Sequence, residues 1–489
     1  MNKRQFTIAL LALLSSTINA QVSQQKPRLV VTITIDQLNS DYIAQFAPYF
    51  GLSGFKEILD NGVVFQNVSY PFTPVDRASA IATIMTGTTP FYHGVIGTGW
   101  LHKKTLRPVS CVDDNAYPGI YTTESSSPRN LLTSTITDEL KVATKGQAIV
   151  YGIAQQQDAA ILSAGHAADG AIWKDTYNGG WCTSTYYMTQ APAWLSMFNS
   201  SNSRAKKTDF ERLTELTNLA VTCIEQTGMG HDDVTDMLNI TLNASLPATA
   251  HPKKKNKKQE DSQQNEIAQV YMNLDRQLGD LVSTIQSKVG RENVVFFITG
   301  TGWCTFASTD DYANYRIPTG TFYINRTANL LNLYLGALYG SDLYVKGCSS
   351  NQIYLDVELL EKKRLKINEI LAQSKSFLLQ CEGVCNTHTS ESLLESTDSR
   401  TTLIRNGYNP EVGGQIVVEV APGWKLVNEE SKESHQVDFR TVKFPIIIYG
   451  FGLKHQINKT AVTVDHIAPT IADMIHIRAP NACALNPLW

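Results

Sequence analysis

Five short apolar runs recur along the chain, and each is bounded by turn-forming residues. Runs of this length, rich in β-branched and aromatic side chains, are typical of buried strands. They lie at Leu29–Ile35, Ala148–Ile153, Val294–Thr299, Gln415–Val420 and Phe444–Tyr449. We therefore expect a protein whose strands are spread over nearly the whole length of the chain.

Helix-like stretches lie between these runs, at Leu131–Ala143, Phe210–Glu225 and Ile267–Val289. In the last of them, leucines and a valine recur at helical spacing and form one apolar stripe. Strands that alternate with helices predict an α/β fold whose mostly parallel sheet is covered by helices on both faces. The region from about residue 300 to about residue 412 breaks this rhythm and is expected to form a cap or side lobe.

The amino-terminal segment has the pattern of a secretory signal peptide. Lys3 and Arg4 precede an apolar run from Phe6 to Leu14, and Ile18-Asn19-Ala20 follows as a cleavage site. The apolar run is too short to span a bilayer, and no later stretch is long and apolar enough to do so. We expect residues 1–20 to be removed and residues 21–489 to be exported to the periplasm or cell envelope, without a transmembrane anchor.

Charge and cysteine content bear on the class of partner and on the possibility of disulfides. The formal charge is −3, from 42 basic and 45 acidic residues, so no overall bias indicates a nucleic-acid partner. Eight cysteines in an exported chain permit disulfides, although the sequence does not define their connectivity. Cys381 and Cys385 are the closest pair, and without nearby His or Cys partners they are more typical of a local disulfide than of a zinc site.

Aromatic residues gather between positions 173 and 187. The group consists of Trp173, Tyr177, Trp181, Tyr186 and Tyr187. Packing in the core or under a cap is the first interpretation, because aromatic side chains bury large apolar areas. A ligand-facing aromatic surface is the alternative.

Candidate chemistry begins where the first strand ends, at Asp36, because a carboxylate at this end of a buried strand often holds a metal or ligand in α/β proteins. Several turn motifs follow it. They include the segments 70–79, 86–100 (with TGTTP and HG), 127–140, 164–168, 351–355, 404–408 and 465–470. Together these segments resemble the alkaline phosphatase superfamily, and most closely its type I phosphodiesterase/nucleotide pyrophosphatase branch and the bacterial phosphate-irrepressible alkaline phosphatases.

The resemblance covers the chain from about residue 28 to its end. It implies a three-layer α/β/α sandwich with a cap insertion. It also implies two zinc ions held by Asp and His side chains, and a Thr or Ser nucleophile. In such a site the two cations stabilise the attacking and leaving oxygens, while polar side chains bind the remaining phosphate oxygens.

Under this resemblance Asp36 matches the first metal carboxylate, but the nucleophile position is occupied by Arg77. A guanidinium cannot lose its proton at useful pH, so it is neither a nucleophile nor a metal ligand. Ser79, two residues later, is the nearest hydroxyl and a weak alternative. We hypothesise that an Asp36–Arg77 ion pair replaces the metal at this position and compensates the buried carboxylate.

The positions that would bind phosphate are also changed. Thr98 replaces the family's Asn, and Gln156 and Asp158 replace two cations. These exchanges disfavour a phosphate dianion.

The remaining zinc-ligand positions are changed as well. The family's carboxylate and imidazole ligands are replaced at Leu246, Ala250, Thr301, Gly302 and Ser434. Among the neighbouring residues, His251 and His435 are weak, shifted candidates for metal ligands.

These substitutions favour an inactive member of the superfamily. We expect no zinc cofactor and a role in binding an unknown protein or small-molecule partner, or as an envelope scaffold. The alternative is a metal-dependent hydrolase of phosphate mono- or diesters, or of sulfate esters. Such an enzyme would use zinc in a rearranged centre built from Asp36, Ser79, His251 and His435.

Overall fold

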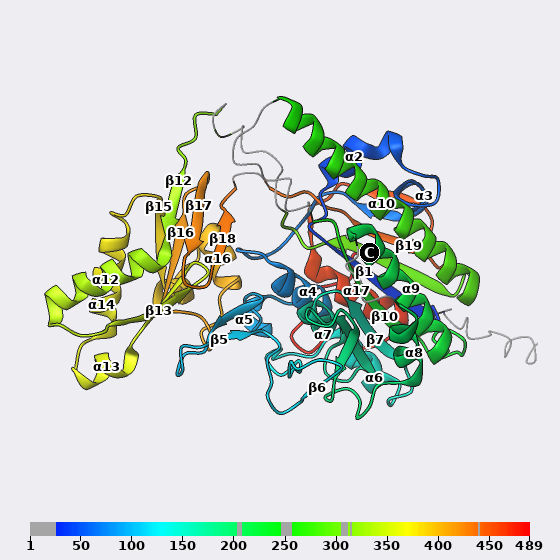
Figure 1. The fold of residues 1–489 in the computed structure, drawn as a ribbon, viewed down its shortest axis with the longest axis horizontal. Helices are drawn as coiled ribbons and strands as arrows, with labels where there is room; N and C mark the ends of the chain where they lie inside the picture. The colour runs from blue at the N-terminus through cyan, green and yellow to red at the C-terminus, as the bar shows by residue number, and fades with distance from the viewer. Residues whose placement is uncertain (1–25, 203–207, 246–256, 305–311, 313–314, 439–440) are drawn as a thin grey trace, which may run out of the picture.

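A ten-stranded sheet forms the centre of the molecule (Figure 1). The computed structural model describes residues 26–202, 208–245, 257–304, 312, 315–438 and 441–489. The strands follow the order β20-β2-β19-β11-β1-β10-β7-β8-β9-β6. In chain order they are β1 (Leu29–Asp36), β2 (Val63–Phe65), β6 (Gly119–Ile120), β7 (Val150–Ala154), β8 (Gly170–Lys174), β9 (Trp181–Ser184), β10 (Asp236–Asn243), β11 (Val294–Gly300), β19 (Ile446–Gly450) and β20 (Gln456–Asn458).

The middle of this sheet is parallel. Strand β1 pairs in parallel with β10 on one side and with β11 on the other, and β10, β7 and β8 continue the parallel arrangement. Antiparallel strands flank it, with β19 against β11 and β9 against β8. Because neighbouring parallel strands end at the same edge, Asp36 at the end of β1 lies opposite Asn243 at the end of β10.

Helices cover both faces of the sheet, and β1 shows why. Its side chains alternate, so that Leu29 and Val31 enter one hydrophobic core and Val30 enters the other. The first core also contains α2 (Ser40–Phe46), α3 (Phe55–Asn61), α8 (Ala193–Ser201), α9 (Asp209–Thr227) and α10 (Lys257–Val289). The second contains α4 (Arg77–Thr86), α6 (Ile136–Ala143), α7 (Gln157–Ala164) and α17 (Ile467–Ile475). The predicted α/β/α sandwich is therefore confirmed.

A smaller group of elements lies beside this body and has its own core (Figure 1). Its three-stranded sheet consists of β12 (Gly320–Tyr323), β17 (Trp424–Asn428) and β18 (Glu433–Gln436), and its four-stranded sheet of β13 (Val345–Ser349), β14 (Gln352–Leu355), β16 (Ile416–Val420) and β15 (Val384–Thr389). Its helices are α12 (Ile324–Tyr339), α13 (Val357–Lys362), α14 (Ile367–Leu378), α15 (Ser390–Glu395) and α16 (Ser399–Asn406). The strand predicted at residues 415–420 thus belongs to this lobe, whose strands continue beyond residue 412.

Short elements complete the chain. They are η1 (Ala47–Tyr49), β3 (Val68–Ser69), α5 (Pro90–His93), β4 (Gly99–Leu101), β5 (Pro108–Ser110), β21 (Val462–Thr463) and η3 (Val464–His466). The helix predicted from residue 131 begins five residues later, at Ile136. The reason is local, because Thr135 caps the helix and forms a reciprocal capping box with Asp138.

No described helix combines the length and the apolarity that crossing a membrane requires. The signal segment 1–20 lies outside the described residues. No disulfide joins any of the eight cysteines, all of which lie in the described part of the chain, so the expected disulfide between Cys381 and Cys385 is not formed. The two sulfur atoms contact different backbone carbonyls, those of Phe377 and Glu419. One cysteine follows a helix and the other lies in β15, and this places their side chains in different surroundings.

Candidate active site

The site is organised by the first turn of α4. Asp76 caps this helix by accepting hydrogen bonds from the backbone N–H of Ser79 at 2.9 Å and from the Ser79 hydroxyl at 2.9 Å. Its second carboxylate oxygen accepts the backbone N–H of Thr98 at 2.7 Å. Asp76 therefore fixes the start of α4 and the neighbouring turn at once. Ser79 is fully buried and acts as a capping residue, which argues against the weak nucleophile role considered from the sequence.

Arg77, the first residue of α4, lies between two buried carboxylates. Its Nε and Nη2 donate to both oxygens of Asp158 at 3.1 and 3.0 Å. Its Nη1 lies 3.7 Å from Oδ2 of Asp36, so the predicted ion pair is present. The bidentate contact is nevertheless with Asp158, which sequence reasoning treated only as a lost phosphate-binding position. The sequence did contain a signal for this pairing. Relative to the family pattern, a cation is gained at position 77 and an anion at position 158, as expected of two residues that form an ion pair.

Burial sets the electrostatics of the three charged residues Arg77, Asp36 and Asp158, here called the Arg77 triad. Asp36 is 1% exposed and Asp158 is 7% exposed. Burial raises the pKa of Asp36 to about 6, against the opposing effects of Arg77 and of a hydrogen bond from Thr301. Burial alone would lower the pKa of Arg77, but Asp158 and Asp36 together raise it above its ordinary value. The guanidinium is thus a permanent charge, held where a cation compensates two anions.

The segment after β11 closes the site beside Asp36. Thr301 donates its hydroxyl to Oδ1 of Asp36 at 2.9 Å and accepts the backbone N–H of Gln37 at 3.0 Å. The next residue, Gly302, has a φ of +74°, and a Cβ there would lie 2.3 Å from the ring of Tyr70. The Tyr70 hydroxyl donates to the carbonyl of Gly300 at 3.0 Å, which fixes the ring in this place. A ligand side chain at position 302 would therefore have no room.

The side chains at the remaining predicted positions that the structure describes form no hydrogen bond or ion pair with Arg77, Asp36 or Asp158. Thr98 is exposed and contributes its backbone N–H, while Gln156 precedes α7 without a capping hydrogen bond from its side chain. Ser434 and His435 are exposed on β18, in the smaller lobe. Leu246, Ala250 and His251 lie outside the described residues.

The residues around Asp36 do not fit a two-zinc centre. One carboxylate is available as a ligand, but a permanent guanidinium lies 3.7 Å from it. Cationic metal ions beside this charge would be repelled, and Tyr70 occupies the volume next to Gly302. Among the described residues, moreover, His, Cys, Asp and Glu side chains form no group of three or more that could hold a metal ion.

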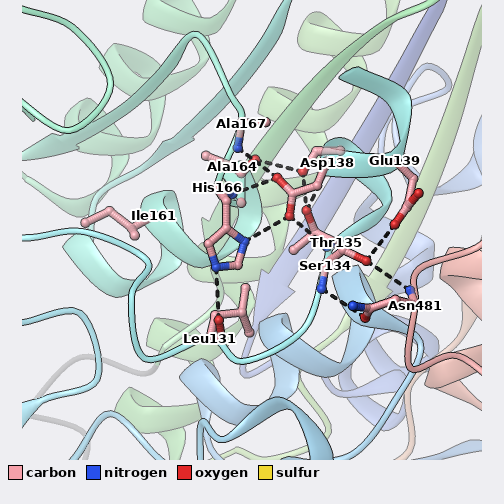
Figure 2. Close-up of polar contacts among 12 residues, drawn as sticks. Leu131, Ser134, Thr135, Asp138, Glu139, Ile161, Ala164, His166, Ala167 and Asn481 are labelled. Carbon is pink, nitrogen blue, oxygen red and sulfur yellow. Dashed lines mark hydrogen bonds and ion pairs between the residues drawn. The ribbon is translucent and has the colours of Figure 1, made fainter. Parts of the chain in front are cut away.

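A second polar cluster joins α6 to the turn after α7 (Figure 2). Oδ1 of Asp138 accepts the backbone N–H groups of His166 and Ala167 at 2.7 and 2.8 Å. Its Oδ2 lies 3.0 Å from Nδ1 of His166, and Nε2 of the same ring lies 2.9 Å from the carbonyl oxygen of Leu131. Since both ring nitrogens face acceptors, the imidazole satisfies both only as the doubly protonated cation. Asp138 correspondingly contributes to a raised pKa of His166, against the effect of burial.

Comparison with known proteins places the chain in a family. The sequence profile described as "Type I phosphodiesterase / nucleotide pyrophosphatase" matches residues 30–443. The chain belongs to this family. Its curated relatives include the alkaline phosphatase PafA of Elizabethkingia meningoseptica, which is 27% identical over 523 residues covering 95% of this chain and 94% of the relative. They also include the alkaline phosphatase PhoV of Synechococcus elongatus, which is 24% identical and covers 98% of each chain.

Solved structures agree with this assignment. The crystal structure of wild-type PafA superposes with a TM-score of 0.83 at 25% identity, covering 95% of this chain and 98% of that one. Murine ectonucleotide pyrophosphatase/phosphodiesterase 5 superposes with a TM-score of 0.54 at 14% identity, which is a likeness of fold alone. The ten-stranded sheet and its helical layers are thus an alkaline-phosphatase-like fold.

Proposed function

We propose that this chain is a non-hydrolytic member of the family that binds a protein or small-molecule partner through the family's fold, in the periplasm or cell envelope. The observation that supports this proposal is the contact of Arg77 with both oxygens of Asp158 beside Asp36. The position at which the resemblance places a hydroxyl nucleophile thus carries a group that can neither attack phosphorus nor bind a metal.

The charge balance supports the same conclusion. A phosphomonoester dianion is normally held by cations and by hydrogen-bond donors. Here the one guanidinium is already paired with two carboxylates, and Asp76 adds a third carboxylate nearby. Among the residues that the structure describes, the site therefore offers no surplus positive charge to a dianionic substrate.

Hydrolysis of phosphate mono- or diesters is the second candidate. It is favoured by the names of the relatives, because PafA and PhoV are alkaline phosphatases and span nearly the whole chain. Such an activity would require zinc held by a ligand set different from the one expected from the resemblance. His251 and His435 are the histidines proposed for such a set.

The test combines metal content with turnover. The purified protein is incubated with excess zinc, desalted and subjected to elemental analysis, and hydrolysis of p-nitrophenyl phosphate and of bis(p-nitrophenyl) phosphate is measured. We expect near-zero retained zinc and turnover equal to that of an Asp36→Asn variant prepared in parallel. About two zinc ions per chain, with turnover lost in that variant and in chelator, would overturn the proposal in favour of hydrolysis. Activity that the variant retains identifies a contaminating phosphatase.

A further inference from the structure

A cavity of about 770 Å³ lies away from the Arg77 triad, at the β6 edge of the ten-stranded sheet. Its walls come from the turn after β6, from the loop that joins β8 to β9, and from α8. They are lined by Tyr121, Thr122, Thr123, Asp175, Tyr177, Asn178, Gly180, Ser196, Asn199 and Ser200. The volume falls within the range of small-molecule sites in proteins.

Two tyrosines supply the aromatic walls of this cavity. The side chain of Tyr177 is 87% exposed and that of Tyr121 is 47% exposed, whereas the nearby Trp173 and Trp181 are each 1% exposed. The aromatic cluster at residues 173–187 is thus divided, with the tryptophans in the core and Tyr177 at the surface. Leaving an aromatic ring in water forgoes the stabilisation that its burial would bring, so a ring held outward at a cavity is a candidate ligand platform.

The loop that carries Tyr177 is held rigidly. Asp175 is 3% exposed, and its Oδ1 accepts the backbone N–H groups of Tyr177 at 2.9 Å and of Asn178 at 2.7 Å. The side-chain amide of Asn178 donates to the carbonyl of Tyr121 at 2.9 Å, which links the two aromatic walls. A site fixed before the ligand arrives loses less conformational entropy on binding.

Tyr121 adds an independent sign of a built site. Its φ is +67°, a left-handed conformation that bulky residues rarely adopt. Its hydroxyl lies 2.8 Å from that of Ser196 on α8, and its backbone carbonyl accepts the amide of Asn178, so both the side chain and the backbone of Tyr121 are held. Strained residues that the surrounding structure holds in place are concentrated at ligand sites.

The chemistry of the lining points to a neutral ligand. Apart from the tyrosines and Gly180, the described residues that line the cavity carry amides, hydroxyls and one carboxylate, and none is Lys, Arg or His. The carboxylate, on Asp175, is already engaged by the loop. Aromatic faces combined with amide and hydroxyl groups complement a molecule that has apolar C–H faces and a rim of hydroxyls. A pyranose ring has this form.

The amide oxygen and nitrogen of Asn178 and of Asn199 each bond a backbone group, which leaves each amide one N–H and one lone pair for a ligand. We propose that this cavity binds a neutral oligosaccharide, with a sugar ring stacked on Tyr177 and its hydroxyls bonded to these remaining groups and to the hydroxyls of the lining. The site is separate from the Arg77 triad, and the inference does not depend on the function proposed there.

Isothermal titration calorimetry on the mature protein tests this proposal. The probes are cellotetraose, chitotetraose and maltotetraose, each at up to about 10 mM, a range that covers weak sugar affinities. We expect saturable binding of at least one. Tyr177→Ala should weaken this binding at least about tenfold, as loss of one stacking platform implies, and Ser200→Trp should abolish it by filling the cavity. The matched control is Tyr92→Ala, because Tyr92 is also exposed, at 60%, but does not line the cavity.

Three outcomes would overturn the proposal. One is the absence of saturable binding of all three sugars to a wild-type protein whose thermal unfolding is cooperative. Another is binding that persists unchanged in both Tyr177→Ala and Ser200→Trp. The third is displacement of the bound sugar by inorganic phosphate, which would assign a different, anionic ligand class to the cavity. None of these outcomes bears on the function proposed at the Arg77 triad, since the variants leave that triad intact.

Discussion

At the scale of single residues, the Arg77 triad shows how one substitution depends on another. Arginine at the start of α4 is repelled by the partial positive charge of the helix amino terminus, so its charge has to be balanced by anions close by. Asp158 supplies a bidentate contact and Asp36 a longer one. Buried ion pairs are seldom strongly stabilising, yet removing one partner of such a pair is costly because the other charge remains buried.

Replacing Arg77 by Ala should therefore destabilise the fold. The side chain of Arg77 is 20% exposed, so we expect a loss of about 3 kcal/mol in the free energy of unfolding, at the lower end for a broken buried pair. Urea denaturation at neutral pH measures this loss. The matched control is Arg129→Ala, whose side chain is 67% exposed beside Asp114 and which should cost less than about 1 kcal/mol. Equal effects of the two substitutions would contradict a stabilising role for the triad.

Titration of the Asp36 carboxyl should change the free energy of unfolding with pH. Its pKa is about 6 in the folded protein against 3.8 for the unfolded reference, so the folded state binds the proton more tightly. The free energy of unfolding then falls as pH rises from 3.8 to about 6 and becomes level above that range.

The Asp36→Asn variant isolates this contribution from those of other carboxylates. The difference between wild type and variant should fall by an amount on the order of 2 kcal/mol across that range. Denaturant titrations at a series of pH values measure it. A difference that is constant with pH would mean that the carboxyl has an ordinary pKa.

At the scale of elements, the buried His93 and the half-buried His166 differ in charge because their neighbours differ. His93, on α5, accepts the backbone N–H of Val95 at Nδ1, and its Nε2 lies 3.0 Å from the hydroxyl of Thr83. Burial lowers the pKa of His93 to about 3, so its ring is neutral. His166 faces a carboxylate and a carbonyl and is held as a cation (Figure 2). The local sequence around the two histidines does not distinguish their charges.

The contact between His166 and Asp138 should weaken as pH rises. The folded-state pKa of His166 is raised above its ordinary value of 6.5. The stabilisation of the fold by the protonated imidazole is therefore complete below pH 6.5 and is lost as pH rises through the folded-state pKa. Thermal unfolding of wild type and His166→Gln should differ by about 1–2 kcal/mol at pH 6 and converge at higher pH. His93 titrates in the same way in both proteins and cancels in the comparison. A gap that widens with pH would refute the charged state of His166.

This cluster also ties the end of the chain to the body. Ser134, just before α6, accepts the backbone N–H of Asn481 at 2.9 Å and donates to Glu139 at 2.7 Å (Figure 2). Arg478 donates to the same Glu139 at 2.7 and 3.0 Å. Residues far apart in sequence thus converge on the first turn of one helix, whose start is fixed by its own capping box.

At the scale of the whole molecule, the eight cysteines lie in separate segments of the described chain and form no disulfide. Alkylation of the denatured, unreduced protein should therefore modify eight thiols, as measured by mass spectrometry. In the native protein Cys385, which is exposed, should react first with a thiol reagent. Cys111, Cys182 and Cys223 are buried and should be protected, and burial also raises the pKa of each thiol.

The control for this measurement is Cys385→Ser, which should lose the fast phase of the reaction. Fewer than eight modified thiols in the denatured protein would reveal a disulfide.

The large-scale fold could be read from the sequence because its signals are local. Continuous apolar runs such as Leu29–Ile35 form strands wherever both faces are buried, and a stripe such as that in α10 forms a helix. The limits of elements depend on caps, which explains why the predicted helix at residue 131 starts at Ile136. The apolar run at residues 415–420 predicts a strand, but its membership in the smaller lobe depends on pairing with β14 and β15, which local sequence does not encode.

The sequence by itself determined the fold family, and it placed Arg77 at the position where the resemblance implies a nucleophile. Both conclusions depend on short motifs of neighbouring residues. Only the tertiary structure decided that Asp158, which is 81 residues away, is the principal partner of Arg77. It alone also decided that His166 is charged and that Tyr177 faces solvent at a cavity. The reason is physical. Charge, burial and hydrogen bonding are properties of neighbours in space, and folding brings those neighbours together from distant parts of the chain.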